Sequence, residues 1–533
     1  MPGRTEVQQS ANRKRRWGLW LAWFTLSLLF LVAAVLIVSV YDAGPILRRR
    51  VVQTLSDRFD SKVELGAFHV TIAKGFHVSG QDLRIYGQND PNTHQLGVQP
   101  LISIGNFNFQ VGIWNLLHSP THIDTVFVRG LSLNIPPKND RQQIARMRKS
   151  GGKAKIYVSH FICDHAQLVI NTSTPGKLPL VFDIQNLTMD ETAPGQALQF
   201  EADLANPKPV GMIHSSGRFG PWQEDSPQET PVEGSYSFTG ADLSTIKGIG
   251  GTLSSTGRYS GALDNIVVDG KTDTPDFKVA RSGHAVPLVT EFHARVDGTS
   301  GDTYLEPVRA KILHSSLVAR GFVVKVAAPA GHRVKLNVEV TGGRIDDLLS
   351  LGVRTDPPVM TGKVNLHADF DLPTGDEDLS DRLRLSGAFQ ISGAHFSNDK
   401  IQDKVGALSL RSQGKPKLAK TDLSDEVLAE VGGTFRLTSG VLSFSKLQFT
   451  VPGTEVNMTG RYSLDGNEFN FHGKARLQAK LSHMTTGWKA ILLKPVDPFF
   501  SKHGAGTELP VKITGTKSEP HFGLDFGHHE IKD

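Results

Sequence analysis

The chain has 533 residues, of which 39% are hydrophobic and 21% are charged, and its mean hydropathy is −0.20. This composition excludes a multi-pass membrane protein and an intrinsically disordered chain, and the length accommodates more than one domain. The single cysteine, Cys163, excludes an intramolecular disulfide, and a net charge of +5 over the whole chain is too small to indicate a nucleic-acid partner.

A basic tail and an apolar segment open the chain. Residues 1–16 end in the run RKRR, and residues 17–41 are uncharged and mostly apolar, with tryptophans and a tyrosine near the ends. At 1.5 Å per residue the apolar segment makes about 37 Å of helix, which is enough to cross a bilayer. We expect an uncleaved transmembrane anchor with a cytoplasmic N-terminus, and a cleaved signal peptide is the competing interpretation.

The next region, residues 42–150, begins with a short helix. Leu47, Val51, Leu55 and Phe59 fall on one face of the stretch PILRRRVVQTLSDRF, which predicts an amphipathic helix directly after the anchor. Further on, the basic stretch KNDRQQIARMRKSGGKAK indicates a surface linker, with attraction to lipid headgroups as the alternative. We therefore place a boundary at residue 150, between two β-regions at 42–150 and 151–533.

The region 151–533 alternates apolar and polar residues with a period of two, which is the pattern of strands with one apolar face and one solvated polar face. The stretch TEVNMTGRYSLDGNEFNFHGKARLQAKL at 454–481 does so on both sides of Asp465-Gly466, a dipeptide that favours a hairpin turn. Short helices are predicted at 342–352, 421–433 and 481–493. The fold class is therefore mainly β, a long antiparallel sheet with a few short helices after the membrane helix.

Motifs that carry chemistry are missing from the sequence. It contains no GxxxxGK[ST] phosphate loop, no GxSxG elbow and no HExxH zinc motif, and its histidines are dispersed. The acidic run at 376–381 lacks the ligand spacing of a calcium loop. We therefore expect no enzyme, with no catalytic residue, no cofactor and no metal site.

Three stretches carry a family resemblance. They are KVELGAFHVTIAKGFHVSGQDLRIYG after the anchor, GGTLSSTGRYSGALDNIVVDGKTDTPDFKV in the middle, and FHGKARLQAKLSHMTTGWKAILLKPVDPFFSKHGAGTELPVKITGTKSEPHFGLD near the end. Together with the order of anchor, short helix and β-region, they resemble the AsmA family, including its TamB group. The resemblance implies an anchored inner-membrane protein whose bulk is periplasmic and whose curled sheet forms a β-groove for phospholipid.

A groove of this kind would support lipid transport or outer-membrane homeostasis, with the inner membrane, phospholipid, and outer-membrane or other envelope proteins as partners. The alternatives are a non-catalytic scaffold or assembly factor for outer-membrane proteins, a glycan-binding protein, and a β-sandwich whose two apolar faces cover each other. The residues expected to line the groove are Val364, Leu366, Phe370, Leu385, Phe389, Ile391, Val456, Met458, Tyr462, Phe469, Phe471 and Leu477. A membrane-touching tip or end cap, or a helix packed on the sheet, is expected from Trp488, Ile491, Leu492, Leu493, Phe499 and Phe500.

Overall fold

The computed structural model describes residues 48–525 with interruptions, the longest at 87–99, 113–120, 136–155, 172–179 and 495–505. The chain forms two compact units, the first made of Met1–Ile170 with Val181–Phe200 and the second of Asn171–Leu180 with Glu201–Asp533. The predicted tail at 1–16 and the predicted anchor at 17–41 lie outside the described residues, as does the predicted boundary at 150. None of the helices in the described part has the length and apolar character needed to cross a membrane.

The first unit is a sheet built mainly from antiparallel neighbours. Its strands are β1 (Val63–Glu64), β2 (Phe68–Ile72), β3 (Phe76–Ile85), β4 (Ile102–Val111), β5 (Thr121–Ile135), β6 (Ile156–Ile170) and β7 (Leu180–Asp190). Strands β2 to β5 pair in antiparallel order, and β1 pairs with the far end of β3. Strands β5 and β6 are parallel, which differs from the antiparallel pairing that the sequence predicts. Parallel neighbours need a long connection, and residues 136–155, which join β5 to β6 in the chain, lie outside the described residues.

Helical residues between 48 and 56 cover one end of this sheet. Val51 and Leu55 pack against a buried cluster that includes Leu83 and Ile85, so these two residues confirm the predicted amphipathic face. The other two residues of that predicted face, at positions 47 and 59, lie outside the described residues. The helix therefore protects the apolar surface of β1, β3 and β4.

The second unit holds most of β8 and all the later elements. The strands are β8 (Leu198–Pro207), β9 (Val210–Phe219), β10 (Pro231–Asp242), β11 (Ile249–Gly250), β12 (Thr252–Ala262), β13 (Asn265–Val279), β14 (Val286–Asp297), β15 (Asp302–Ile312), β16 (Ser315–Ala327), β17 (Ala330–Arg344), β18 (Met360–Leu372), β19 (Arg384–Phe396), β20 (Ala429–Thr438), β21 (Val441–Val451), β22 (Thr454–Ser463), β23 (Glu468–Leu477), β24 (Thr507–Thr516) and β25 (Pro520–Leu524). The helices are α4 (Ile345–Gly352), α5 (Leu379–Arg382), α6 (Asp399–Ser412) and α7 (Leu418–Thr421), with 3-10 turns η2 (Pro227–Glu229), η3 (Leu243–Thr245) and η4 (Leu481–Met484).

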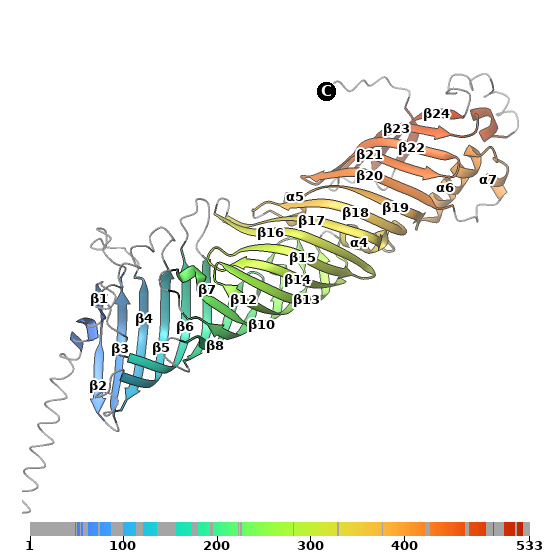
Figure 1. The fold of residues 1–533 in the computed structure, drawn as a ribbon. Coiled ribbons are helices and arrows are strands. Elements are labelled where there is room, and N and C mark those ends of the chain that lie inside the picture. Colours follow the sequence, from blue (N-terminus) through green and yellow to red (C-terminus); the bar gives the residue numbers. More distant parts are fainter. Residues whose placement is uncertain are drawn as a thin grey trace, which may run out of the picture. The chain divides into compact units, whose positions relative to one another are not determined.

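From β9 onward these strands form a long antiparallel ladder in which neighbours in the chain are neighbours in the sheet, except that β10 pairs with β12 and the two-residue strand β11 pairs with β13. Every pairing from β9 through β10 and β12 to β25 is antiparallel, and Figure 1 shows β12 to β24 side by side in chain order. The hairpin predicted at 454–481 is confirmed, because Ser463 of β22 pairs with Glu468 of β23 across the turn. The mainly β, antiparallel fold that the sequence predicts is confirmed for this unit.

The helices of the second unit agree only partly with the sequence. Helix α4 lies within the predicted segment 342–352. The prediction at 421–433 is wrong for its second half, because residues 429–433 belong to β20. Helix α6 was not predicted. It has only a weak apolar stripe, because the residues that it buries are Val405, Gly406, Ser409 and Ser412.

The ladder has two faces of opposite character. We call the face that carries Leu366, Phe389 and Tyr462 the inner face, and the opposite one the outer face. The outer face carries cross-strand ion pairs, such as Lys271 with Glu291 at 2.7 Å on β13 and β14. The charged side chains of neighbouring strands are therefore solvated on the outer face. The alternation places the apolar residues of β16 to β24 on the inner face.

Candidate functional site

All twelve predicted lining residues lie on the inner face of β18, β19, β22 and β23. The register pairs Leu366 with Phe389 and Phe370 with Leu385 across β18 and β19, and it pairs Val364 with Ile391. On the later strands Tyr462 pairs with Phe469, while Val456, Met458, Phe471 and Leu477 each pair with another residue of the same face. The structure therefore brings these residues together in two patches, each shared by two neighbouring strands.

Strands β20 and β21 join the two patches, and the prediction missed their residues. Phe435 of β20 and Phe444 of β21 face each other across the ladder. The ring of Phe389 lies 6.2 Å from that of Phe435 and 6.3 Å from that of Phe444. The ring of Phe444 lies 5.8 Å from that of Phe471.

The result is an aromatic row that runs across β19 to β23. It continues from Phe471 to Phe469 at 6.3 Å and from Phe469 to Tyr462 at 4.9 Å. These separations are those of interacting ring pairs. The alternation in the sequence GGTFRLTSGVLSFSKLQFT could have identified the missing members on β20 and β21, because it is the same signal that identified the others.

Two helices cover one end of this face. Val364, Ile391 and other residues at that end are 0 to 9% exposed, and Val405 of α6 belongs to the same buried cluster. Ile345 and Leu348 of α4 pack against the cluster as well. This end is therefore a closed core filled by the protein's own side chains, as a β-sandwich would be throughout.

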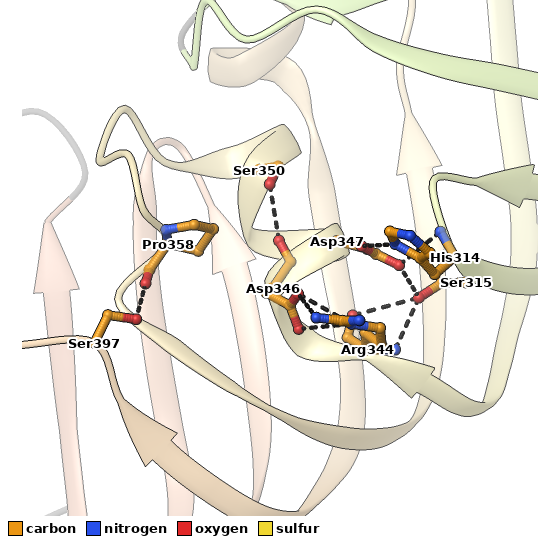
Figure 2. Close-up of polar contacts among 8 residues, drawn as sticks. All are labelled: His314, Ser315, Arg344, Asp346, Asp347, Ser350, Pro358 and Ser397. Carbon is orange, nitrogen blue, oxygen red and sulfur yellow. Dashed lines mark hydrogen bonds and ion pairs between the residues drawn. The ribbon is translucent and has the colours of Figure 1, made fainter.

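Helix α4 is held in place by a buried carboxylate. Figure 2 shows Asp347 turned toward the β15–β16 turn, where its side chain accepts hydrogen bonds from the Ser315 hydroxyl at 2.7 Å and the His314 backbone N–H at 3.0 Å. The Ser315 oxygen in turn accepts the backbone N–H of Arg344 at 2.8 Å, and Arg344 pairs with Asp346 at 2.7 Å. Asp347 is only 2% exposed, so this network fixes α4 to β16 and β17.

Helix α6 is fixed by small polar residues instead. The Ser409 hydroxyl donates to the carbonyl of Pro452 at 2.8 Å, and the Thr454 hydroxyl donates to Ser412 at 2.6 Å. The Gln402 amide donates to the carbonyl of Val427 at 2.9 Å. Because small residues allow close approach, α6 lies directly on β21 and β22 at the end of the ladder.

Away from these helices the inner face is only partly covered. Phe370, Leu385, Phe444, Tyr462 and Phe469 are half-buried, in contrast to the buried residues under α4 and α6. Large apolar side chains in this state leave a continuous apolar surface in contact with solvent, which marks a candidate binding surface. The predicted end-cap residues at 488, 491–493 and 499–500 lie outside the described residues.

The inner face changes character toward β9. Here hydroxyl groups pair across the strands: Ser215 with Tyr259 at 2.7 Å, Tyr236 with Ser255 at 3.1 Å, and Thr272 with Thr290 at 2.6 Å. Burial raises the pKa of both tyrosines above the ordinary value, so both stay protonated. The sequence did not predict this hydroxyl-lined zone.

Glycines let aromatic rings lie flat in that zone. A Cβ added at Gly257 would lie 2.7 Å from the Tyr236 ring, and one at Gly234 would lie 2.7 Å from the Tyr259 hydroxyl oxygen. Each ring therefore occupies the space above a glycine of the neighbouring strand. This arrangement accounts for the recurrent glycine–aromatic pattern in stretches such as VEGSYSFTG. Because the rings lie over glycines, they project less far from the sheet.

Among the described residues, no group of three or more His, Cys, Asp and Glu is placed to hold a metal ion. The thiol of Cys163 is buried, which raises its pKa and keeps it in the unreactive neutral form. Searches with protein-family models, among curated proteins and among solved structures gave no match to this chain.

Proposed function

We propose that the inner face of the second unit binds the acyl chains of phospholipid and thereby supports lipid transport or outer-membrane homeostasis. The observation that carries the proposal is the aromatic row of β19 to β23, which continues beyond α4 and α6 as half-buried side chains. Apolar contact is nondirectional, so this surface would favour hydrocarbon over polar ligands but would discriminate little between different acyl chains. No bond is broken in this activity, and the chain is proposed to act without catalysis.

The energetic argument concerns the cost of hydrocarbon in water. Burial of one methylene contributes about 0.8 kcal/mol, so one sixteen-carbon chain in water costs on the order of 12 kcal/mol. A half-buried aromatic surface that takes up such a chain removes much of this cost. The ion pairs of the outer face keep the opposite side of the same strands soluble.

The cellular setting is part of the same proposal. The resemblance to the AsmA family supports an inner-membrane anchor at 17–41, a cytoplasmic N-terminus and a periplasmic second unit, with envelope proteins as further partners. The long antiparallel ladder and the low, glycine-lined floor are compatible with a groove of this kind.

The test is lipid extraction and native mass spectrometry of the full chain purified from membranes. We expect copurified phospholipid in the wild type and its loss in the double variant Phe389→Glu, Phe444→Glu, because both substitutions place charge in the aromatic row. The matched control is Val289→Glu, Val441→Glu, which adds the same charge at exposed positions of the outer face.

Circular dichroism of each variant reports whether the sheet persists. A folded wild type without bound lipid would refute the proposal. Equal lipid content in the inner-face and outer-face variants would refute the assignment of the binding surface.

A further inference from the structure

A basic pair lies on the inner face near the turn between β16 and β17. The register of these strands runs without a shift and pairs Lys325 with His332, next to the pair of Val323 with Val334. Both basic residues therefore continue the face that carries Leu317 and Val340 toward the core under α4. These two basic side chains lie at the margin of an apolar surface, whereas the outer face of the same strands offers solvated positions. Their placement on the inner face therefore suggests a role there.

A third basic residue comes from a distant turn. Lys208, between β8 and β9, lies close enough for its charge to act on the ring of His332. Asp302 places a carboxylate nearby, which accepts the backbone N–H of Lys325 at 3.3 Å. Among the described residues named here, the cluster combines two lysines and a histidine with the carboxylate of Asp302, a balance that favours an anion.

The protonation behaviour of the cluster agrees with this view. The ring of His332 reaches solvent on one side, yet its pKa lies below the ordinary value, first because of burial and then because of the charges of Lys325 and Lys208, while Asp302 acts in the opposite direction. Burial also lowers the pKa of Lys325. A bound anion would relieve the repulsion among these groups, so they are poised to gain from one.

The apolar surface starts directly beside the basic pair. Val334 pairs with Leu372 of β18, and Leu336 pairs with Phe370, one of the half-buried residues of the inner face. An anion at Lys325 and His332 that carries hydrocarbon chains would therefore place those chains on Val334 and Phe370, in the direction of the aromatic row.

We propose that Lys325 and His332, assisted by Lys208, bind the phosphodiester group of a phospholipid whose acyl chains lie on the inner face. This inference rests on the proposed function and adds a headgroup site to it. The Lys325 ammonium group supplies charge-assisted hydrogen bonds to phosphate oxygens, and the His332 ring, which its lowered pKa keeps neutral near pH 7, donates one N–H. Asp302 remains beside them and disfavours a second negative charge.

The test compares two lipids with identical tails, dioleoyl phosphatidylglycerol and dioleoylglycerol, which lacks the phosphate. Each lipid displaces a pyrene-tailed diacylglycerol probe from the purified full chain. We expect the double variant Lys325→Gln, His332→Gln to bind the phospholipid about tenfold more weakly, the loss typical of charge-assisted contacts, and to bind dioleoylglycerol unchanged.

The control variant is Lys311→Gln, Lys335→Gln, which removes two cationic side chains from exposed positions of the outer face on β15 and β17. It should bind both lipids like the wild type. If the wild type binds neither lipid, the proposed function itself fails. If the wild type binds both lipids and the inner-face variant keeps its full affinity for the phospholipid, the headgroup site alone is refuted.

Discussion

The buried carboxylate of α4 gives the sharpest prediction for stability. Asp347 is 2% exposed and accepts hydrogen bonds from the Ser315 hydroxyl and the His314 backbone N–H. The substitution Asp347→Ala leaves both donors without their acceptor, and each such loss costs about 1–3 kcal/mol. We expect α4 to lose about 3 kcal/mol of local stability, which corresponds to roughly a hundredfold more frequent opening.

The assay is amide hydrogen exchange of the full chain, followed by mass spectrometry of peptides that cover 340–352. Asp347→Asn keeps one acceptor oxygen and should give an intermediate rate. The matched control is Asp346→Ala, at the adjacent position of the same helix, whose carboxylate pairs with the exposed guanidinium of Arg344 and should contribute less than the buried network. Equal exchange rates in Asp347→Ala and Asp346→Ala would refute the view that the buried network holds α4 on the ladder.

Three further outcomes follow from individual contacts. Gly257→Ala should destabilise the second unit by about 2 kcal/mol in thermal unfolding, because the new Cβ would lie 2.7 Å from both the Tyr236 ring and the backbone oxygen of Asp269; an unchanged midpoint would contradict this close packing. Gly406→Ala should stabilise α6 by about 0.5–1 kcal/mol in the same experiment, because nothing lies within 4 Å of the added Cβ. Arg333 holds the pKa of Asp371 below its ordinary value of 3.8, so their pair stabilises the fold above pH 3.8 and loses this effect as the pH falls through the lowered pKa. Arg333→Gln should therefore weaken the acid dependence of the unfolding midpoint, and an identical pH profile would contradict the pairing.

The sequence predicted the strands and the faces well because their signal is local. Alternation placed Leu366, Phe389 and Tyr462 on the apolar faces of their strands, and the register of β18 to β22 shows that these are one face of the ladder. Whether the two patches touch depends on the order of the strands in the sheet. Because β18 to β23 pair in chain order, this order is the simplest one that the sequence allows. The residues on β20 and β21 were missed even though they follow the same rule.

Other features could not be predicted from local patterns. Helix α6 buries Ser409 and Ser412 through hydrogen bonds, so it lacks the apolar period by which helices are recognised. The parallel pairing of β5 and β6 is a tertiary choice that neither strand encodes. The cluster around His332 depends on the approach of Lys208 from a turn more than a hundred positions earlier, which no periodicity reports.

The pairing order of the second unit has a consequence for how such a protein can change in size. Because each described strand from β14 to β24 pairs only with the strand before and the strand after it, insertion of one complete hairpin between two of these strands restores both the chain direction and the side on which each side chain lies. Each duplication would lengthen the ladder by about 10 Å without disturbing its remainder. Gene duplication can therefore change the length of the ladder in units of one hairpin.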